Sequence, residues 1–219
     1  MPERGERSYD DPCGIARALD LVGERWALLL VRELIFGPKR FTDLRHGLAG
    51  ASQNVIAQRL RELERHGVVE RMRLGPPARV PAYRLTRLGR ELEPVLLALA
   101  RWGSDLPIRT ANELSTDALM FALRATYEPP GRSTRLREYE IRFELDQYRV
   151  ITGTDIQVAR GPATDPDAVI ATAPDVLRDL VYAGRSLPLS LDRGEITIVG
   201  DRSAVRRLIT SFRRPPTTE

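Results

Sequence analysis

The sequence has little of the material that disulfides, metal sites and membrane spans require. Its 219 residues include one cysteine, Cys13, and two histidines, His46 and His66. A single cysteine excludes a disulfide within the chain, and these widely spaced ligands give no basis for a zinc site. No apolar run approaches the roughly 20 residues of a transmembrane helix, and the charged start MPERGERSYDDP lacks the apolar core of a secretory signal. We therefore expect a cytoplasmic protein with no membrane segment, metal or other cofactor.

Charge is distributed unevenly along the chain. The net charge is only +4, and Lys39 is the one lysine among 34 basic residues. Residues 39–90 contain 12 basic and 4 acidic side chains, a net +8 that exceeds the charge of the whole chain. Such a local excess favours a polyanionic partner, usually nucleic acid, although a solvated basic surface has the same composition.

The apolar pattern of the first half predicts helices and one hairpin. Ser52 is a good N-cap for one of these helices, and Gly67 is suited to end it. We expect helices over 12–22, 25–36, 41–47 and between Ser52 and Gly67, then strands over 68–74 and 80–85 around the loop at 75–79. A long helix follows over about 87–103, with a stripe that we expect to be buried: Leu88, Leu92, Val95, Leu96 and Leu99.

The second half has a different character, which indicates a second domain. A polar segment with a proline, residues 104–116, is typical of a linker. We then expect helices over 116–125, 174–183 and 202–212, and strands over 137–145, 148–153, 155–160, 167–172 and 195–199. The predicted fold class is therefore α+β: a winged helix-turn-helix over 8–106, followed by an α+β sheet-and-helix domain over 113–214.

The order helix, helix, turn, helix, strand, loop, strand is that of a winged helix-turn-helix. An α-helix fits the major groove of B-DNA, and the side chains of its first turns must then read base edges. Gln and Asn can bond adenine, Arg can bond guanine, and basic residues at a helix N-terminus or a wing tip can hold phosphate. The expected contacts to double-stranded DNA are Lys39, Arg40, Thr42, Ser52, Gln53, Asn54, Gln58, Arg61 and Arg79.

The stretch Cys13–Gly103 resembles the HxlR-type bacterial transcriptional regulators. The matching motifs are C-x5-L-D-x-V-G-x-R-W-A-L-L-L-V-R-E-L from Cys13, G-P-K-R-F-T-D-L-R from Gly37, S-Q-x-V-I-A-Q-R-L-R-E-L-E-R-H-G from Ser52, and Y-R-L-T-x-L-G-R-E-L-x-P-V from Tyr83. The resemblance implies a homodimer joined through the N-terminal helix and helix 87–103. It also implies palindromic operators, whose successive major grooves lie about 34 Å apart.

Cys13 aligns with a cysteine that some members of this family use to sense oxidants or electrophiles. The resemblance therefore implies an alternative function, a redox sensor acting through Cys13 with a purely structural second domain. A thiol buried in the dimer core would explain the same residue without any reactivity.

The second half shows no catalytic constellation, so we do not expect an enzyme. It has no histidine or cysteine, and its acids alternate along predicted strands as on a solvent-facing sheet. Residues 167–212 resemble the end of sterol-carrier-protein type domains, which implies an apolar tunnel for a small hydrophobic ligand or, as a third alternative, a lipid carrier. The expected wall residues, which an ordinary core would also explain, are Leu119, Leu123, Leu177, Val181, Leu187, Leu208 and Phe212.

Overall fold

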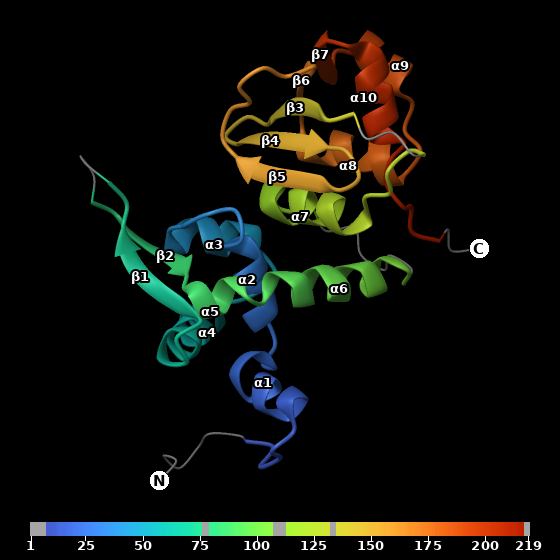
Figure 1. Ribbon diagram of the computed structural model, residues 1–219. Helices are drawn as coiled ribbons and strands as arrows, with labels where there is room; N and C mark the ends of the chain where they lie inside the picture. Colours follow the sequence, from blue (N-terminus) through green and yellow to red (C-terminus); the bar gives the residue numbers. More distant parts are fainter. Residues whose placement is uncertain (1–7, 76–78, 107–112, 132–134, 217–219) are drawn as a thin grey trace. The chain divides into compact units, whose positions relative to one another are not determined.

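The computed structural model describes residues 8–75, 79–106, 113–131 and 135–216 (Figure 1). The chain divides into two compact units, Met1–Leu96 and Leu97–Glu219. The division falls inside a helix, α6 (Glu93–Ser104), and so comes before the segment 104–116 that we expected as a linker. Part of that segment, 107–112, lies outside the described residues, as does part of the predicted wing loop, 76–78.

The first unit contains short helices followed by a two-stranded antiparallel sheet. Its elements are α1 (Gly14–Val22), α2 (Ala27–Glu33), α3 (Phe41–Gly47), α4 (Gln53–Arg65), β1 (Val69–Arg73), β2 (Pro81–Leu85), α5 (Arg87–Arg90) and the start of α6. This order confirms the winged helix-turn-helix, with α3 and α4 as its two helices and β1 and β2 as its wing.

Helix α4 is defined by the two residues that flank it. The hydroxyl of Ser52 accepts the N–H of Val55 at 3.4 Å, which satisfies one of the free donors at the start of the helix. Gly67, just beyond the helix, has φ 69°, a left-handed conformation that favours glycine. Between them Ile56, Leu60 and Leu63 are buried at helical spacing, so the opposite side of α4 is left on the surface.

The helix that we expected over 87–103 is instead divided into α5 and α6. Pro94 lacks the N–H that would bond the carbonyl of Arg90, and a proline ring crowds the preceding turn of a helix. The expected burial of its apolar stripe is also wrong for a single chain. Leu96 is buried, whereas Val95 is 55% and Leu99 46% exposed.

The second unit is built on a five-stranded mixed sheet of order β5-β4-β3-β6-β7, in which β3 and β6 are parallel and all other neighbours antiparallel. Helices cover one face of this sheet (Figure 1). The strands are β3 (Arg137–Arg142), β4 (Gln147–Thr152), β5 (Ile156–Arg160), β6 (Ala168–Thr172) and β7 (Ile196–Gly200). The helices are α7 (Thr116–Thr126), α8 (Pro174–Tyr182), α9 (Leu187–Asp192) and α10 (Arg202–Ile209). Helix α9 is absent from our sequence prediction.

The two faces of the sheet have different chemistry. Tyr139, Ile141 and Val150 point to the helix-covered face and are buried. On the other face Glu138 and Glu140 accept N–H groups from the connection between β5 and β6, at 3.0 Å from Thr164 and 2.8 Å from Ala163. The acids that we expected on an open solvent face are thus partly covered by that connection.

An ion pair between a buried acid and a partly exposed arginine holds α7 against the edge of the sheet. The carboxylate of Asp117 is fully buried, and Arg160 Nη2 on β5 lies 2.7 Å from each of its oxygens. Tyr148 also donates its hydroxyl to Asp117, at 2.5 Å. A buried charge is tolerated when it is paired and hydrogen-bonded in this way, so we interpret the group as structural.

In the described part of the chain, no helix combines the length and apolar character needed to cross a bilayer.

Candidate nucleic-acid interface

The exposed side of α4 carries most of the residues that we expected to read bases. Gln53, Asn54, Gln58 and Arg61 are all exposed. Asn54, Gln58 and Arg61 lie opposite the buried stripe of the same helix, and Gln53 is exposed as the first residue of α4. Gln58 donates to Glu62 at 3.1 Å, one turn further along. We refer to these four exposed residues as the α4 polar stripe. Asn54, Gln58 and Arg61 present amide and guanidinium groups on one side of the helix, and Gln53 adds an amide at its first turn. Polar groups placed in this way on a helix that enters a major groove can read base edges.

One ion pair joins α4 to the rest of the unit and a second lies within the helix, and sequence reasoning missed both. Arg59 Nη2 lies 3.2 Å from the carboxylate of Glu24, in the turn between α1 and α2. Arg59 also pairs with Glu62 on its own helix. Opposite charges at helical spacing are visible in the sequence, but the contact to Glu24 depends on the tertiary fold. Arg59 therefore holds α4 in place and is not part of the α4 polar stripe.

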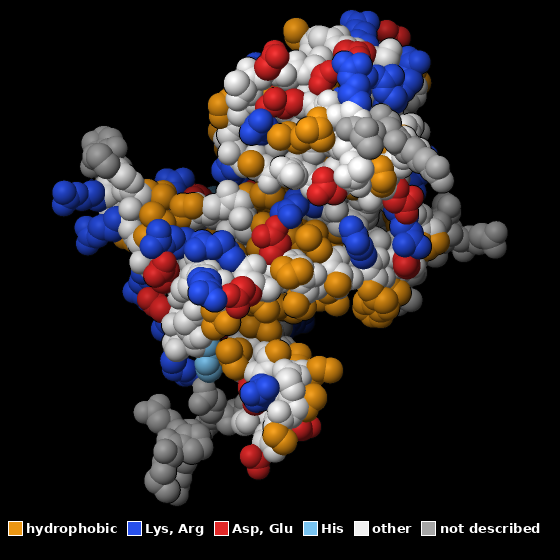
Figure 2. Space-filling model, viewed as in Figure 1, with side chains coloured by type: hydrophobic (Ala, Val, Ile, Leu, Met, Phe, Trp, Pro, Cys, Tyr) orange, Lys and Arg blue, Asp and Glu red, His pale blue; other side chains and the backbone are white. Residues whose placement is uncertain are grey.

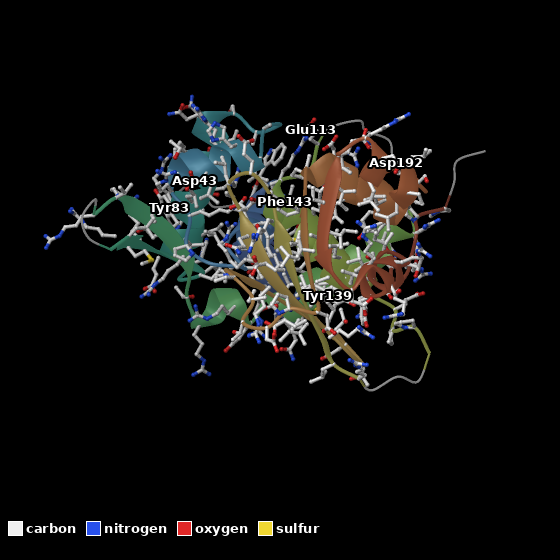
Figure 3. The ribbon with its side chains drawn as sticks, turned by 90° about the horizontal axis from the view of Figure 1, so that it is seen from above. Asp43, Tyr83, Glu113, Tyr139, Phe143 and Asp192 are labelled. Carbon is white, nitrogen blue, oxygen red and sulfur yellow. The ribbon has the colours of Figure 1, made fainter. Side chains whose placement is uncertain are left out.

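Arg40, at the start of α3, is engaged by an acid of the same helix. Its backbone N–H donates to Asp43 Oδ2 at 3.1 Å, and its guanidinium Nε and Nη2 each donate to the same carboxylate at 3.0 Å. Burial alone would raise the pKa of Asp43, but the hydrogen bonds and charge of Arg40 outweigh it and lower that pKa. Asp43, labelled in Figure 3, thus offsets the positive charge of Arg40, which we expected to contact a phosphate. Thr42, the residue before Asp43, is exposed.

Asp43→Asn is expected to strengthen DNA binding. The amide oxygen can still cap the N–H of Arg40, while Arg40 gains a free charge for phosphate. One further phosphate contact per protomer adds two contacts per dimer, and at about 0.9 per contact this should steepen the slope of log affinity against log salt by about 1.8. Fluorescence anisotropy of a labelled duplex over a salt series measures this slope. An unchanged slope would show that Arg40 makes no phosphate contact.

Lys39 lies in a buried ion pair. Its Nζ is 2.6 Å from Glu33 Oε2, and its side chain is only 13% exposed. Glu33 is fully buried at the end of α2 and is also bonded by Arg32 Nη2 at 2.8 Å. The backbone of Lys39 pairs with Tyr83 on β2 through bonds of 3.0 and 2.8 Å, which ties the turn before α3 to the wing. The phosphate contact that we expected of Lys39 remains a prediction, and it would have to compete with Glu33.

Lys39→Ala is expected to lower the free energy of unfolding. The loss should be about 2 kcal/mol, less than the 3–5 kcal/mol typical of a buried charge left alone, because Arg32 still pairs with Glu33. Chemical denaturation monitored by circular dichroism gives this value. A stable variant that binds DNA more weakly would instead assign Lys39 to phosphate contact.

The wing places Arg79 on the surface after its tip. The N–H of Leu74 donates to the carbonyl of Val80 at 2.9 Å and closes the hairpin. Arg79 is exposed with φ 38°, so it occupies the left-handed region without being glycine. Non-glycine residues with a positive φ are uncommon. The arrangement is compatible with the contact that we expected of Arg79.

The apolar residues that we expected to line a tunnel in the second unit lie in a packed core. Five of them border one cavity of about 10 Å³: Leu123, Leu177, Val181, Leu208 and Phe212. Leu119 is fully buried, and Leu187 is partly exposed. A cavity of this size has room for about one water molecule. The structure therefore shows no open tunnel at these residues.

Cys13 is the residue immediately before α1, and it is exposed. Its N–H donates to Asp11 Oδ1 at 2.8 Å. Within the described ranges, no group of three or more His, Cys, Asp or Glu side chains is arranged to hold a metal ion.

The family model described as HxlR-like helix-turn-helix matches residues 21–110. An uncharacterized HTH-type transcriptional regulator of Synechocystis is 42% identical over 94 residues, which cover 42% of this chain and 69% of that protein. A similar regulator of Bacillus subtilis, YdeP, is 40% identical over 93 residues, covering 42% of this chain and 71% of YdeP. The solved structure of "Redox regulator HypR in its oxidized form" is 33% identical and covers 44% of this chain and 99% of that chain, with a TM-score of 0.41.

Proposed function

This chain belongs to the HxlR-like helix-turn-helix family, and on that basis we propose that it is a bacterial transcription regulator that binds palindromic operator DNA as a homodimer. The observation that carries this proposal is the α4 polar stripe, which lies on the second helix of a winged helix-turn-helix and inside the segment of net charge +8. Such a regulator acts on the bacterial chromosome, in the cytoplasm, and needs no catalytic residues.

The homodimer is supported by apolar side chains that the single chain leaves exposed. On α6 these are Val95, Leu99 and Trp102, and on α1 Ile15 is 71% exposed. Figure 2 shows orange side chains gathered along both helices. Exposed apolar side chains that gather in this way are typical of interaction sites. The two helices are also those that the family resemblance implies for the dimer.

Selection of bound duplexes from a random DNA pool tests the function. The full-length protein should enrich an inverted repeat whose half-sites lie one helical turn, about 10 bp, or a multiple of it apart. Enrichment of a single unrepeated site would contradict the dimer, and no enrichment of any sequence would contradict the regulator.

The exposed thiol of Cys13 favours a second candidate function, a thiol-based switch. Cys13→Ser should then abolish the release of DNA by diamide or hydrogen peroxide, which is expected to be at least about tenfold in the parent protein. The substitution replaces sulfur by oxygen at an exposed position, so folding should be unaffected. DNA release that persists in the variant, or no release in either protein, would reject the switch.

The hydrophobic-ligand alternative has weaker support than DNA binding. A sensor or lipid carrier of this kind would have to open the core around Leu123 and Phe212, whose present cavity is about 10 Å³. Extraction of the purified protein with organic solvent, followed by mass spectrometry, tests it directly. A stoichiometric lipid would establish this alternative.

A further inference from the structure

The second unit contains a cleft that neither the DNA-binding proposal nor the packed core explains. It has a volume of about 150 Å³ and lies where β3 begins and β4 ends, beside α10. Tyr127 is placed there because the chain after α7 pairs with the chain after α10, through a bridge between Tyr127 and Phe212. The rings of these two residues meet edge to face, with their centroids 5.8 Å apart. The cleft is thus formed by the fold itself.

The charged side chains that line this cleft are all basic. They are Arg135, Arg137 and Arg207, and among the described residues no Asp or Glu lines it. The acids nearby are already engaged by backbone N–H groups: Asp201 accepts from Ala204 at 2.9 Å, and Asp167 accepts from Glu138 at 2.9 Å.

These two acids hold Arg137 in place without using its whole guanidinium group. Both carboxylates lie 3.2 Å from the same nitrogen of Arg137, Nη1. Arg207 Nη2 is 3.6 Å from Asp201. Within the described residues the ion pairs of Arg137 therefore leave Nε and Nη2 for a further acceptor. A guanidinium group held in position by other acids is well suited to bind a carboxylate or phosphate.

The rest of the cleft wall is aromatic and apolar, with a few hydroxyl groups. The hydroxyl of Tyr127 donates to the carbonyl of Gly153 at 3.0 Å, and that of Tyr139 to the carbonyl of Ala204 at 3.3 Å. Burial raises the pKa of both tyrosines, so they remain neutral. Tyr127 is partly exposed, whereas Tyr139 is only 1% exposed and forms the floor of the cleft. Leu208 adds an aliphatic wall. Tyr139 is labelled on β3 in Figure 3.

We propose that this cleft binds a small organic carboxylate whose apolar body is about the size of one six-membered ring. The arginines provide the partners for the carboxylate, and the partly exposed Tyr127 provides apolar surface for the body, with the buried Tyr139 and Leu208 behind it. The size follows from the volume, because a cavity of about 150 Å³ is sufficient to hold benzene. The proposal does not depend on DNA binding, and it gives the second unit a ligand of a different class from the lipid that the sterol-carrier resemblance implies.

Calorimetric titration of the full-length protein tests this site with three probes: benzoate, benzyl alcohol and inorganic phosphate. Benzoate should bind with one site per chain. Benzyl alcohol keeps the ring but lacks the charge, and phosphate keeps the charge but lacks the ring, so each should bind at least about tenfold more weakly. Absence of saturable binding by benzoate overturns the proposal. Phosphate binding as tight as that of benzoate overturns the assigned ligand class.

Two neighbouring arginines provide a matched pair of variants. Arg207→Ala removes a charge that lines the cleft and should weaken benzoate binding about tenfold. Arg206→Ala removes the same charge from an equally exposed class of position on the same helix, but Arg206 does not line the cleft, so binding should be unchanged. Arg137 is the less suitable choice for this test because its two ion pairs also support the fold. An equal loss of benzoate affinity in both variants would show that net charge alone causes the loss, and it would reject the site.

Discussion

The double substitution Gln53→Ala and Arg61→Ala should remove most of the preference for the operator over random DNA. Each well-formed base contact is worth about 1–3 kcal/mol. A dimer loses four such contacts, which at about 1 kcal/mol each corresponds to about a thousandfold loss of specific affinity. Non-specific affinity should fall much less, because phosphate contacts supply most of it. Competition binding between the selected palindrome and a scrambled duplex measures both terms.

The outcome can be interpreted because Gln53 and Arg61 belong to the exposed α4 polar stripe. Both side chains are exposed, Arg61 on the side opposite Ile56, Leu60 and Leu63 and Gln53 at the first position of α4, so the variant should keep its free energy of unfolding. Arg87→Ala is the matched control, because it removes one charge from the same basic segment. Arg87 is on α5 and forms an exposed ion pair with Glu91, the residue just after that helix. That control should lower both affinities slightly and leave their ratio unchanged. Full operator preference in the double variant would show that α4 is not the reading helix.

Local sequence signals were sufficient to predict most helices and strands of the first unit. Gln53–Arg65 was predictable because its N-cap, its apolar spacing and its terminal glycine are consistent with one another. The break between α5 and α6 was missed because the leucine spacing continues through Pro94. Helix α9 was missed because the leucines of SLPLSLD alternate, which is not the period of a helix. The capping signal was present, since the hydroxyl of Ser186 accepts the N–H of Leu189 at 3.5 Å.

The candidate interface was predictable only as a list of exposed polar residues. Asn54 and Arg61 are on the surface as their position in the helical period indicates, and Gln53 is exposed at the first position of the helix. Lys39 is not an open charge, because an acid six residues earlier, Glu33, is brought beneath it by the turn between α2 and α3. Composition counts charges, and the fold decides which of them are already neutralised. For that reason a net +8 overstates the charge available to DNA.

The apolar stripe of α6 is a case in which the sequence prediction and the single-chain structure differ in an informative way. Leucine spacing predicted burial, and Leu99 is 46% exposed in one chain. Both statements hold if a second copy covers this helix. The double substitution Val95→Glu and Leu99→Glu is therefore expected to give a monomer, because it places two carboxylates per protomer in an apolar interface, where unpaired charges are costly.

Loss of the dimer should also weaken operator binding at least about a hundredfold, because the second half-site then no longer benefits from the high effective concentration of a linked partner. Analytical ultracentrifugation measures the first effect, and anisotropy on whole and half operators the second. Leu145→Glu is the control: Leu145 is 92% exposed in the turn between β3 and β4, and changing it should leave mass and binding as they are. A folded double variant that remains dimeric would place the interface elsewhere. A monomer that still binds the whole operator with full affinity would show that operator binding does not require the dimer, because two protomers would then bind the two half-sites independently.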